Sequence, residues 1–166
     1  MKLTGRVWKF EQDDVNTDQI RPKMYAHLPL KDQARHCLEG LDPEFGNKVT
    51  RGDILVGGRN FGAGSSTPAF AALITLGIAA VVAESFARVF FRGSISGGLV
   101  VIACPGILEH VTDGDIVEVD TIASEVRNLT AGGALTSTPL PTVLRDMVEL
   151  GGEKAYLKAR IAAAAR

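Results

Sequence analysis

The residue types best suited to chemistry gather in one glycine-rich stretch, GGRNFGAGSSTPA, at residues 57–69. Ser65 and Ser66 lie side by side in it. Gly62 and Gly64 precede them and allow positive φ and the close approach of a ligand to the backbone. If a helix follows, its first N–H groups are unpaired and favour an anion. The stretch therefore predicts either an anion site beside a reactive serine or a polar cap on a helix that binds nothing.

The same stretch predicts where that helix begins. Pro68 suits the first helical position, where its missing N–H costs little, and Thr67 or Ser66 suits the N-cap before it. The stretch is not a P-loop, because the lysine of GxxxxGK[ST] is missing, and its glycines have the wrong spacing for a dinucleotide-binding GxGxxG motif.

Apolar strands and helical segments alternate around the glycine-rich stretch. Short apolar runs predict buried strands at 52–58, 77–85 and 97–104. Segments with helical spacing lie between them, at 68–76 and 85–95. This order is typical of βαβ units, in which a parallel sheet is covered by helices. The glycine-rich stretch follows the first of these strands directly.

The remaining segments extend this α/β pattern. Residues 3–10 alternate as a strand does, and 11–20 are acidic and Asx-rich, which predicts a loop of Asx turns. Residues 114–120 and 124–130 alternate with a period of two and predict an antiparallel hairpin near the edge of the sheet. An amphipathic helix followed by an Ala-rich tail is expected within 137–166.

The composition is that of an ordinary globular chain of 166 residues, with 46% hydrophobic residues and a net charge of −1. Charges of both signs are interspersed, so nothing indicates a surface for nucleic acid or an anionic membrane. No apolar run approaches the roughly 20 residues of a membrane span, and the start lacks the apolar core of a secretory signal. Cys37 and Cys104 match no metal-binding spacing. We expect a cytoplasmic protein.

Three segments taken together are far more specific than any one of them. They read NTDQIRP at 16–22, GDILVGGRNFGAGSS at 52–66 and VVAESFARVFFRGSISGGL at 81–99. They resemble the small subunit of the aconitase-family isomerases and hydro-lyases, of which 3-isopropylmalate dehydratase is the commonest. That family shows NTDxIxP, GxNFGxGSSREHA and AESFARIFYRNAxNxGL in this order. The resemblance covers roughly residues 5–150.

The resemblance implies one aconitase-type swivelling domain over 1–166, three-layered (β/β/α), with a mostly parallel sheet, an antiparallel hairpin and a helical tail at 151–166. Such a domain docks on a large subunit whose [4Fe–4S] cluster binds the substrate. The reaction is dehydration or isomerisation of a 2-hydroxydicarboxylic acid, most often 3-isopropylmalate in leucine biosynthesis. The small subunit itself binds no cofactor or metal, so Cys37 and Cys104 are expected to be buried apolar residues.

The family's roles fall on residues of the first two motifs. Ser65 matches the base that removes the carbon-bound proton, a role that needs a stabilised alkoxide. Ser66, Gly64 and Asn60 match positions that hold the alkoxide or the substrate. Asp18 matches an orienting hydrogen-bond partner near the active site, although taken alone it also suits an Asx-turn cap.

The chain departs from the family where GSSREHA is replaced by GSSTPAF. Thr67 stands in place of an arginine that clamps a substrate carboxylate, a loss worth about 2 kcal/mol in binding. Either the substrate differs at that carboxylate, or another cation replaces the arginine. Arg21 is the candidate cation, and the alternative is a solvent-exposed arginine.

The largely apolar segment 23–30, which includes Tyr25 as an expected substrate contact, favours an alkyl-substituted malate. A dimethylmalate- or homoaconitate-type hydro-lyase, or a non-catalytic paralogue, remains open as an alternative.

Overall fold

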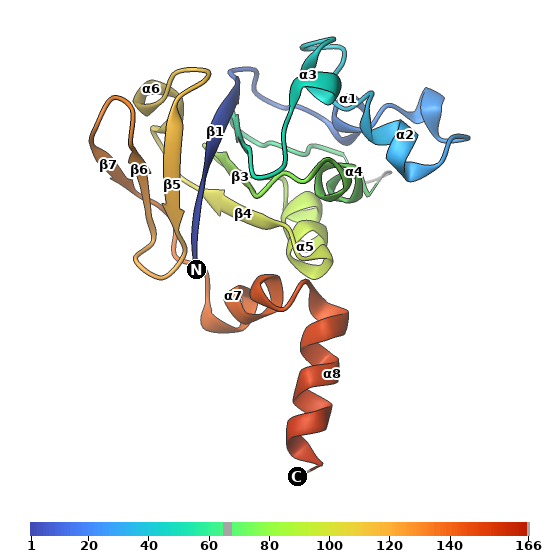
Figure 1. Ribbon diagram of the computed structural model, residues 1–166, viewed down its shortest axis with the longest axis vertical. Helices are drawn as coiled ribbons and strands as arrows, with labels where there is room; N and C mark the ends of the chain where they lie inside the picture. Colours follow the sequence, from blue (N-terminus) through green and yellow to red (C-terminus); the bar gives the residue numbers. More distant parts are fainter. Residues whose placement is uncertain (65–67, 166) are drawn as a thin grey trace.

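The computed structural model describes residues 1–64 and 68–165, and these form a mixed α/β fold around one seven-stranded sheet (Figure 1). The strands are β1 (Lys2–Phe10), β2 (Ile54–Gly57), β3 (Ala80–Ala83), β4 (Val100–Ala103), β5 (Ile116–Asp120), β6 (Glu125–Asn128) and β7 (Ala134–Thr136). The helices are α1 (Thr17–Ile20), the 3-10 turn η1 (Lys23–Tyr25), α2 (Leu30–Ala34), α3 (Phe45–Lys48), α4 (Ala69–Leu76), α5 (Arg88–Gly97), α6 (Ile107–His110), α7 (Thr142–Glu149) and α8 (Glu153–Ala164). The strand order is β4-β3-β2-β1-β5-β6-β7.

Strands β1 to β4 form the parallel half of the sheet. Every residue of β2 and β3 is buried, which explains why these strands are short continuous apolar runs. α4 connects β2 with β3, and α5 connects β3 with β4. The βαβ order expected from the sequence is confirmed, and it places the glycine-rich stretch between β2 and α4.

Strand β1 is shared between the two halves of the sheet. Its first residues, from Lys2 to Arg6, pair with β5 in antiparallel fashion, whereas Val7 to Phe10 pair with β2 in parallel. β5 and β6 form the expected antiparallel hairpin. The short β7, which the sequence did not predict, extends it. Within the described residues the pairings are therefore three parallel and three antiparallel, so the antiparallel part exceeds the hairpin expected.

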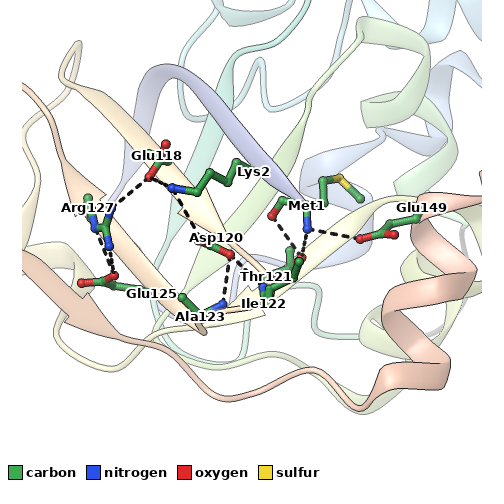
Figure 2. A network of polar contacts seen from close by, with 10 residues as sticks. All are labelled: Met1, Lys2, Glu118, Asp120, Thr121, Ile122, Ala123, Glu125, Arg127 and Glu149. Carbon is green, nitrogen blue, oxygen red and sulfur yellow. Dashed lines mark hydrogen bonds and ion pairs between the residues drawn. The ribbon is translucent and has the colours of Figure 1, made fainter.

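Charged side chains cross the antiparallel half from strand to strand (Figure 2). The Lys2 ammonium lies 3.0 Å from Glu118 and 3.6 Å from Asp120. The Arg127 guanidinium lies 2.6 Å from Glu125 and 3.4 Å from Glu118. Because solvent screens such pairs, they contribute little stability, but their opposite charges match the register of β1, β5 and β6.

The core under β1 is aromatic, with one polar anchor. The ring of Phe45, on α3, meets Trp8 and Phe10 edge-on, at centroid distances of 5.2 and 5.4 Å. The Trp8 indole N–H donates to the buried carboxylate of Asp53 at 2.8 Å, and the Thr50 amide donates to the same oxygen at 2.9 Å. These bonds fix the start of β2 against β1, immediately before the glycine-rich stretch.

A helix replaces part of the loop expected at 11–20. Asn16 is the N-cap of α1, and its side-chain oxygen accepts from the amides of Asp18 and Gln19. The Gln19 side chain accepts from the Asn16 amide in return, which completes a capping box. Asx residues start helices with the same hydrogen bonds that they use in turns, so the sequence pattern did not distinguish the two.

Helix α4 starts one residue later than expected. Ala69 is its first residue, and Pro68 is the N-cap, with no side-chain capping bond. The N-cap position predicted for Ser66 or Thr67 is therefore wrong, because the N-cap of α4 is Pro68. Ser65, Ser66 and Thr67 themselves lie outside the described residues. The helix ends at Gly77, which adopts the left-handed conformation expected after a helix.

Helix α8 projects away from the sheet and the other helices (Figure 1). Of its residues only Tyr156 is buried, and the Leu157 and Ile161 side chains are 49% and 69% exposed. The helical tail expected after residue 150 is therefore confirmed as a helix. Among the described residues, no helix is long and apolar enough to cross a membrane.

Candidate active site

The NTD segment lies directly against the glycine-rich stretch. The amides of Gly62 and Ala63 donate to the Val15 carbonyl at 2.8 and 3.1 Å. The Thr17 amide donates to the Ala63 carbonyl at 2.9 Å, and Asn16 and Ala63 form a parallel β-bridge. Two segments far apart in the sequence are thus joined by backbone hydrogen bonds.

The third motif borders the stretch at Phe61. The Phe61 amide donates to the Ser85 carbonyl, and the Ala87 amide donates to the Phe61 carbonyl, both at 3.0 Å. The Asn60 amide donates to the Ser85 hydroxyl at 2.9 Å, and its side-chain amide donates to Asp14 at 2.7 Å. All three motif segments therefore meet within a few residues of one loop.

The two glycines before Ser65 have backbone angles that side chains disfavour. Gly62 has a φ of +82°, and a Cβ there would lie 2.1 Å from Cγ of the Phe90 ring. Gly64 has a φ of +83°, with the Thr17 hydroxyl 3.4 Å from a Cβ position. Gly62 therefore allows the loop to pack closely against Phe90 of α5. Gly64 allows a left-handed turn of the backbone next to Thr17 of α1.

Asp18 lies on α1, next to the residue that pairs with the loop. Its carboxylate is 3.2 Å from the Lys23 ammonium, and its side chain is about half exposed (46%). The N-cap of α1 is Asn16 and not Asp18. The structure thus places Asp18 directly after Thr17, whose amide bonds to the loop at Ala63, and the role of Asp18 there stays a prediction.

Arg21 reaches from the end of α1 to Pro68, the residue before α4. Its Nε donates to the Gln33 side-chain oxygen at 2.7 Å, and Nη1 donates to the Pro68 carbonyl at 3.4 Å. Arg21 is partly buried. In residues 1–64 and 68–165, none of the ion pairs involves it. The alternative of a fully exposed arginine is therefore wrong.

Gln33 is the site residue that the sequence analysis missed. Its side chain is buried, and its amide group donates to the carbonyls of Leu28, at 2.5 Å, and Ala26, at 3.4 Å. The only signal in the sequence was one of burial: Gln33 precedes Ala34 and lies four residues before Cys37, and both of these residues are buried.

Tyr25 packs on the segment that follows it. Its ring stacks on His36 at a centroid distance of 3.6 Å, and the His36 Nδ1 lies 2.7 Å from the Glu39 carboxylate. A hydrogen bond to Glu39 raises the pKa of Tyr25, and burial and the charge of Glu39 act in the same direction. The structure therefore places Tyr25 as a support of the loop at 23–39; a contact with substrate stays a prediction.

A mostly apolar pocket of about 220 Å³ opens beside Gly64, between α4 and α5. It is lined by Thr17, Gly64, Pro68, Phe70, Val89, Phe90 and Gly93. Val89, on α5, is 57% exposed and contributes to the wall of this pocket. Pro68 thus accepts a hydrogen bond from Arg21 and also lines the apolar pocket.

The described part of the chain offers no metal centre: no group of three or more His, Cys, Asp or Glu side chains there is placed to hold an ion. Cys37 and Cys104 are fully buried free thiols, as expected. Burial raises the pKa of Cys37 to about 12, against the opposing charge of Arg21, and that of Cys104 to about 11. Both thiols are therefore protonated at neutral pH.

Residues 2–106 match the family model described as the aconitase C-terminal domain. The 3-isopropylmalate dehydratase small subunit of Heliobacterium modesticaldum is 40% identical over 164 residues, 98% of each chain. The isopropylmalate/citramalate isomerase small subunit of Methanocaldococcus jannaschii is 44% identical over 162 residues, 96% of each chain.

The fold has a solved counterpart. A crystal structure of a 3-isopropylmalate dehydratase protein from Methanocaldococcus jannaschii superimposes with a TM-score of 0.91 at 38% sequence identity. The alignment covers 99% of this chain and 98% of the other. The architecture expected from the three motif segments is therefore confirmed over nearly the whole chain.

Proposed function

Because the chain belongs to the aconitase C-terminal domain family, as one of its 3-isopropylmalate dehydratase small subunits, we propose that it supplies the small-subunit half of a hydro-lyase active site in leucine biosynthesis. The observation that carries this proposal is that residues 15–17 of the first motif region and 85–87 of the third both bond to residues 60–63 of the glycine-rich stretch. We take 1–166 to act as one swivelling domain, with 5–150 as its core.

The rest of the active site belongs, in this proposal, to a large subunit in the same cytoplasm. Its [4Fe–4S] cluster would activate the hydroxyl group of the substrate for departure. The described residues of this chain present no ligand set that fits such a cluster. What this chain supplies is a base, hydrogen-bond donors and a positive charge around the glycine-rich loop.

Ser65 is the proposed base. A serine can take a proton from carbon only where its alkoxide is stabilised by fixed donors. The loop just before it is held by Val15, and its glycines allow backbone N–H groups to face an anion. Gly64, Ser66 and Asn60 would hold the alkoxide or the substrate, and Asp18 would orient one of these hydrogen bonds.

Arg21 is proposed to bind the substrate carboxylate that an arginine at position 67 binds in relatives. A partly buried guanidinium loses hydration and normally recovers it from a carboxylate. The described residues supply none, and the Arg21 guanidinium lies against the Pro68 carbonyl, next to Thr67 in the sequence. Thr67 would add one neutral hydrogen bond to the same group.

The substrate proposed is 3-isopropylmalate, because the apolar pocket and the segment at 23–30 suit an uncharged branched substituent. The replacement of Arg-Glu-His by Thr67, Pro68 and Ala69 favours a second candidate with altered carboxylate recognition. That candidate is a small subunit acting on another 2-hydroxydiacid, of the dimethylmalate or homoaconitate type.

The test is reconstitution of the chain with its large subunit under anaerobic iron–sulfur loading. We would measure hydration and dehydration of 3-isopropylmalate, citramalate, dimethylmalate and homocitrate. Ser65→Ala is expected to lower kcat by about 10²–10⁴-fold, as for loss of a general base, with the complex still formed. Equal turnover in Ser65→Ala, or no turnover of any of these acids, would contradict the proposal and favour a non-catalytic paralogue.

A further inference from the structure

We propose that Gln33 is a positioning residue that fixes the Arg21 guanidinium for a substrate carboxylate without neutralising its charge. This inference rests on the proposed function, in which Arg21 is the carboxylate-binding cation. Gln33 lies on α2, twelve residues after Arg21, and its side-chain oxygen accepts from Arg21 Nε at 2.7 Å.

The network determines how the Gln33 amide is turned. Its nitrogen lies 2.5 Å from the Leu28 carbonyl and 3.4 Å from the Ala26 carbonyl, and carbonyl oxygens only accept hydrogen bonds. The amide oxygen therefore faces Arg21, which only donates. If the amide were flipped, its oxygen would face the two carbonyl oxygens and its NH₂ group would face the Arg21 N–H. The buried amide therefore has only one orientation in which its hydrogen bonds are satisfied.

A glutamine in this position has a consequence that a glutamate would not have. The usual partner of a partly buried arginine is a carboxylate, which holds the guanidinium and cancels its charge. Gln33 holds the same Nε edge with a neutral oxygen. The nearby Cys37 thiol, with a pKa of about 12, is also neutral. The positive charge of Arg21 thus remains available to an anion from outside the chain.

The same side chain ties Arg21 to the segment that precedes α2. Both carbonyls bonded to the Gln33 nitrogen belong to this segment, directly after Tyr25. A shift of the segment would therefore move the Gln33 amide and, with it, the guanidinium. Gln33 accordingly couples the segment at 23–30, which would contact the substrate substituent, to Arg21, which would bind the substrate carboxylate.

The test uses the reconstituted complex and compares Gln33→Glu with Gln33→Met and Arg21→Ala. Gln33→Glu keeps an acceptor for Arg21 Nε but adds a charge that pairs with the guanidinium. We expect its KM for 3-isopropylmalate to rise at least about tenfold, which is the effect of losing one charged hydrogen bond. Its kcat should change less than about threefold, since a uniform binding contact is lost.

Gln33→Met leaves the charge of Arg21 intact but frees its side chain, and it should raise KM less than Gln33→Glu does. Gln12→Glu is the matched control, because Gln12 is exposed and the same charge is added there. It should leave KM unchanged.

The outcomes separate this inference from the proposed function. Wild-type KM in Gln33→Glu, with a raised KM in Arg21→Ala, would overturn the role of Gln33 alone. Wild-type KM in Arg21→Ala would overturn both the carboxylate role of Arg21 and this inference. If no acid turns over, binding is measured instead, as the rise in Tm of the complex on adding 3-isopropylmalate. A wild-type rise in Tm in Gln33→Glu would overturn the inference. Loss of that rise in Gln33→Glu and Arg21→Ala, but not in Gln12→Glu, would support it.

Discussion

At the scale of single residues, Gly62 combines a left-handed backbone angle with a packing contact against Phe90. Gly132 has a similar φ of +86°, with nothing within 4 Å of a Cβ position. Gly132→Ala should therefore cost only the backbone strain, about 1–2 kcal/mol. Gly62→Ala should cost about 1–3 kcal/mol more, because its methyl group overlaps the Phe90 ring.

Urea unfolding measures both variants, with the fluorescence of Trp8, the single tryptophan, as the signal. Equal losses of unfolding free energy in Gly62→Ala and Gly132→Ala would show that the contact with Phe90 adds no steric cost at position 62. An unchanged m-value would confirm that the variants differ in stability and not in the extent of unfolding.

The candidate site was predictable from the sequence only where its residues belong to a motif. Asn60, Gly64 and Asp18 were identified because their neighbours in the chain have the family's spacing. Gln33 was not, because what defines it is a contact with Arg21 and with two backbone carbonyls across a turn. Pattern and period report which face of a helix is buried, but not which distant polar group a buried amide will meet.

At the scale of elements, the short helix α1 depends on its capping box. Asn16→Ala removes the oxygen that accepts from the Asp18 and Gln19 amides, and should cost about 1 kcal/mol of unfolding free energy. Because Arg21 is the C-cap of the same helix, KM should rise as well. Asn16→Asp keeps an acceptor and should stay within a few tenths of a kcal/mol of wild type.

Chemical denaturation and steady-state kinetics on the reconstituted complex check this prediction together. A loss of stability in Asn16→Ala with no change in KM would mean that α1 does not hold Arg21 in place. Equal losses in Asn16→Ala and Asn16→Asp would mean that the cap contributes nothing.

The elements that the sequence predicted well are those buried on both faces. β2 and β3 are continuous apolar runs, and their type and place were evident. β7 has three residues with exposed ends, so it shows almost no alternation. The four residues of α6 are too few to establish a helical period. The start of α6 is held instead by a distant residue, since the Glu84 carboxylate accepts from the amides of Gly106 and Leu108.

At the scale of the whole molecule, the two buried thiols report on global opening. Cys37 and Cys104 are fully buried, and burial raises both pKa values, to about 12 and about 11. Iodoacetamide at pH 8 should therefore leave the native chain unmodified and should label both thiols in urea, as mass spectrometry would show. Rapid labelling of one thiol in native buffer would reveal local unfolding around that residue alone.

The raised pKa values of the two thiols also make the free energy of unfolding depend on pH above about 9. Below pH 9, the ordinary pKa of a thiol, the folded and unfolded states both keep the Cys37 proton. Between pH 9 and about 12 the unfolded state releases a proton that the folded state retains, so the unfolding free energy falls as pH rises. Urea unfolding at pH 8 and pH 10 measures this fall, which should be smaller in Cys37→Ala. An equal fall in that variant would assign it to other groups.

The sharing of β1 between the two halves of the sheet bears on where the chain can be divided. The family model ends at residue 106, after β4, but the first half of β1 pairs with β5, which begins at Ile116. A fragment cut at 106 would retain all three motif segments and yet leave the backbone from Lys2 to Arg6 without its antiparallel partner. Such a bare strand edge invites pairing with another copy and aggregation. The stretch that the family model matches is thus shorter than the stretch that completes the sheet.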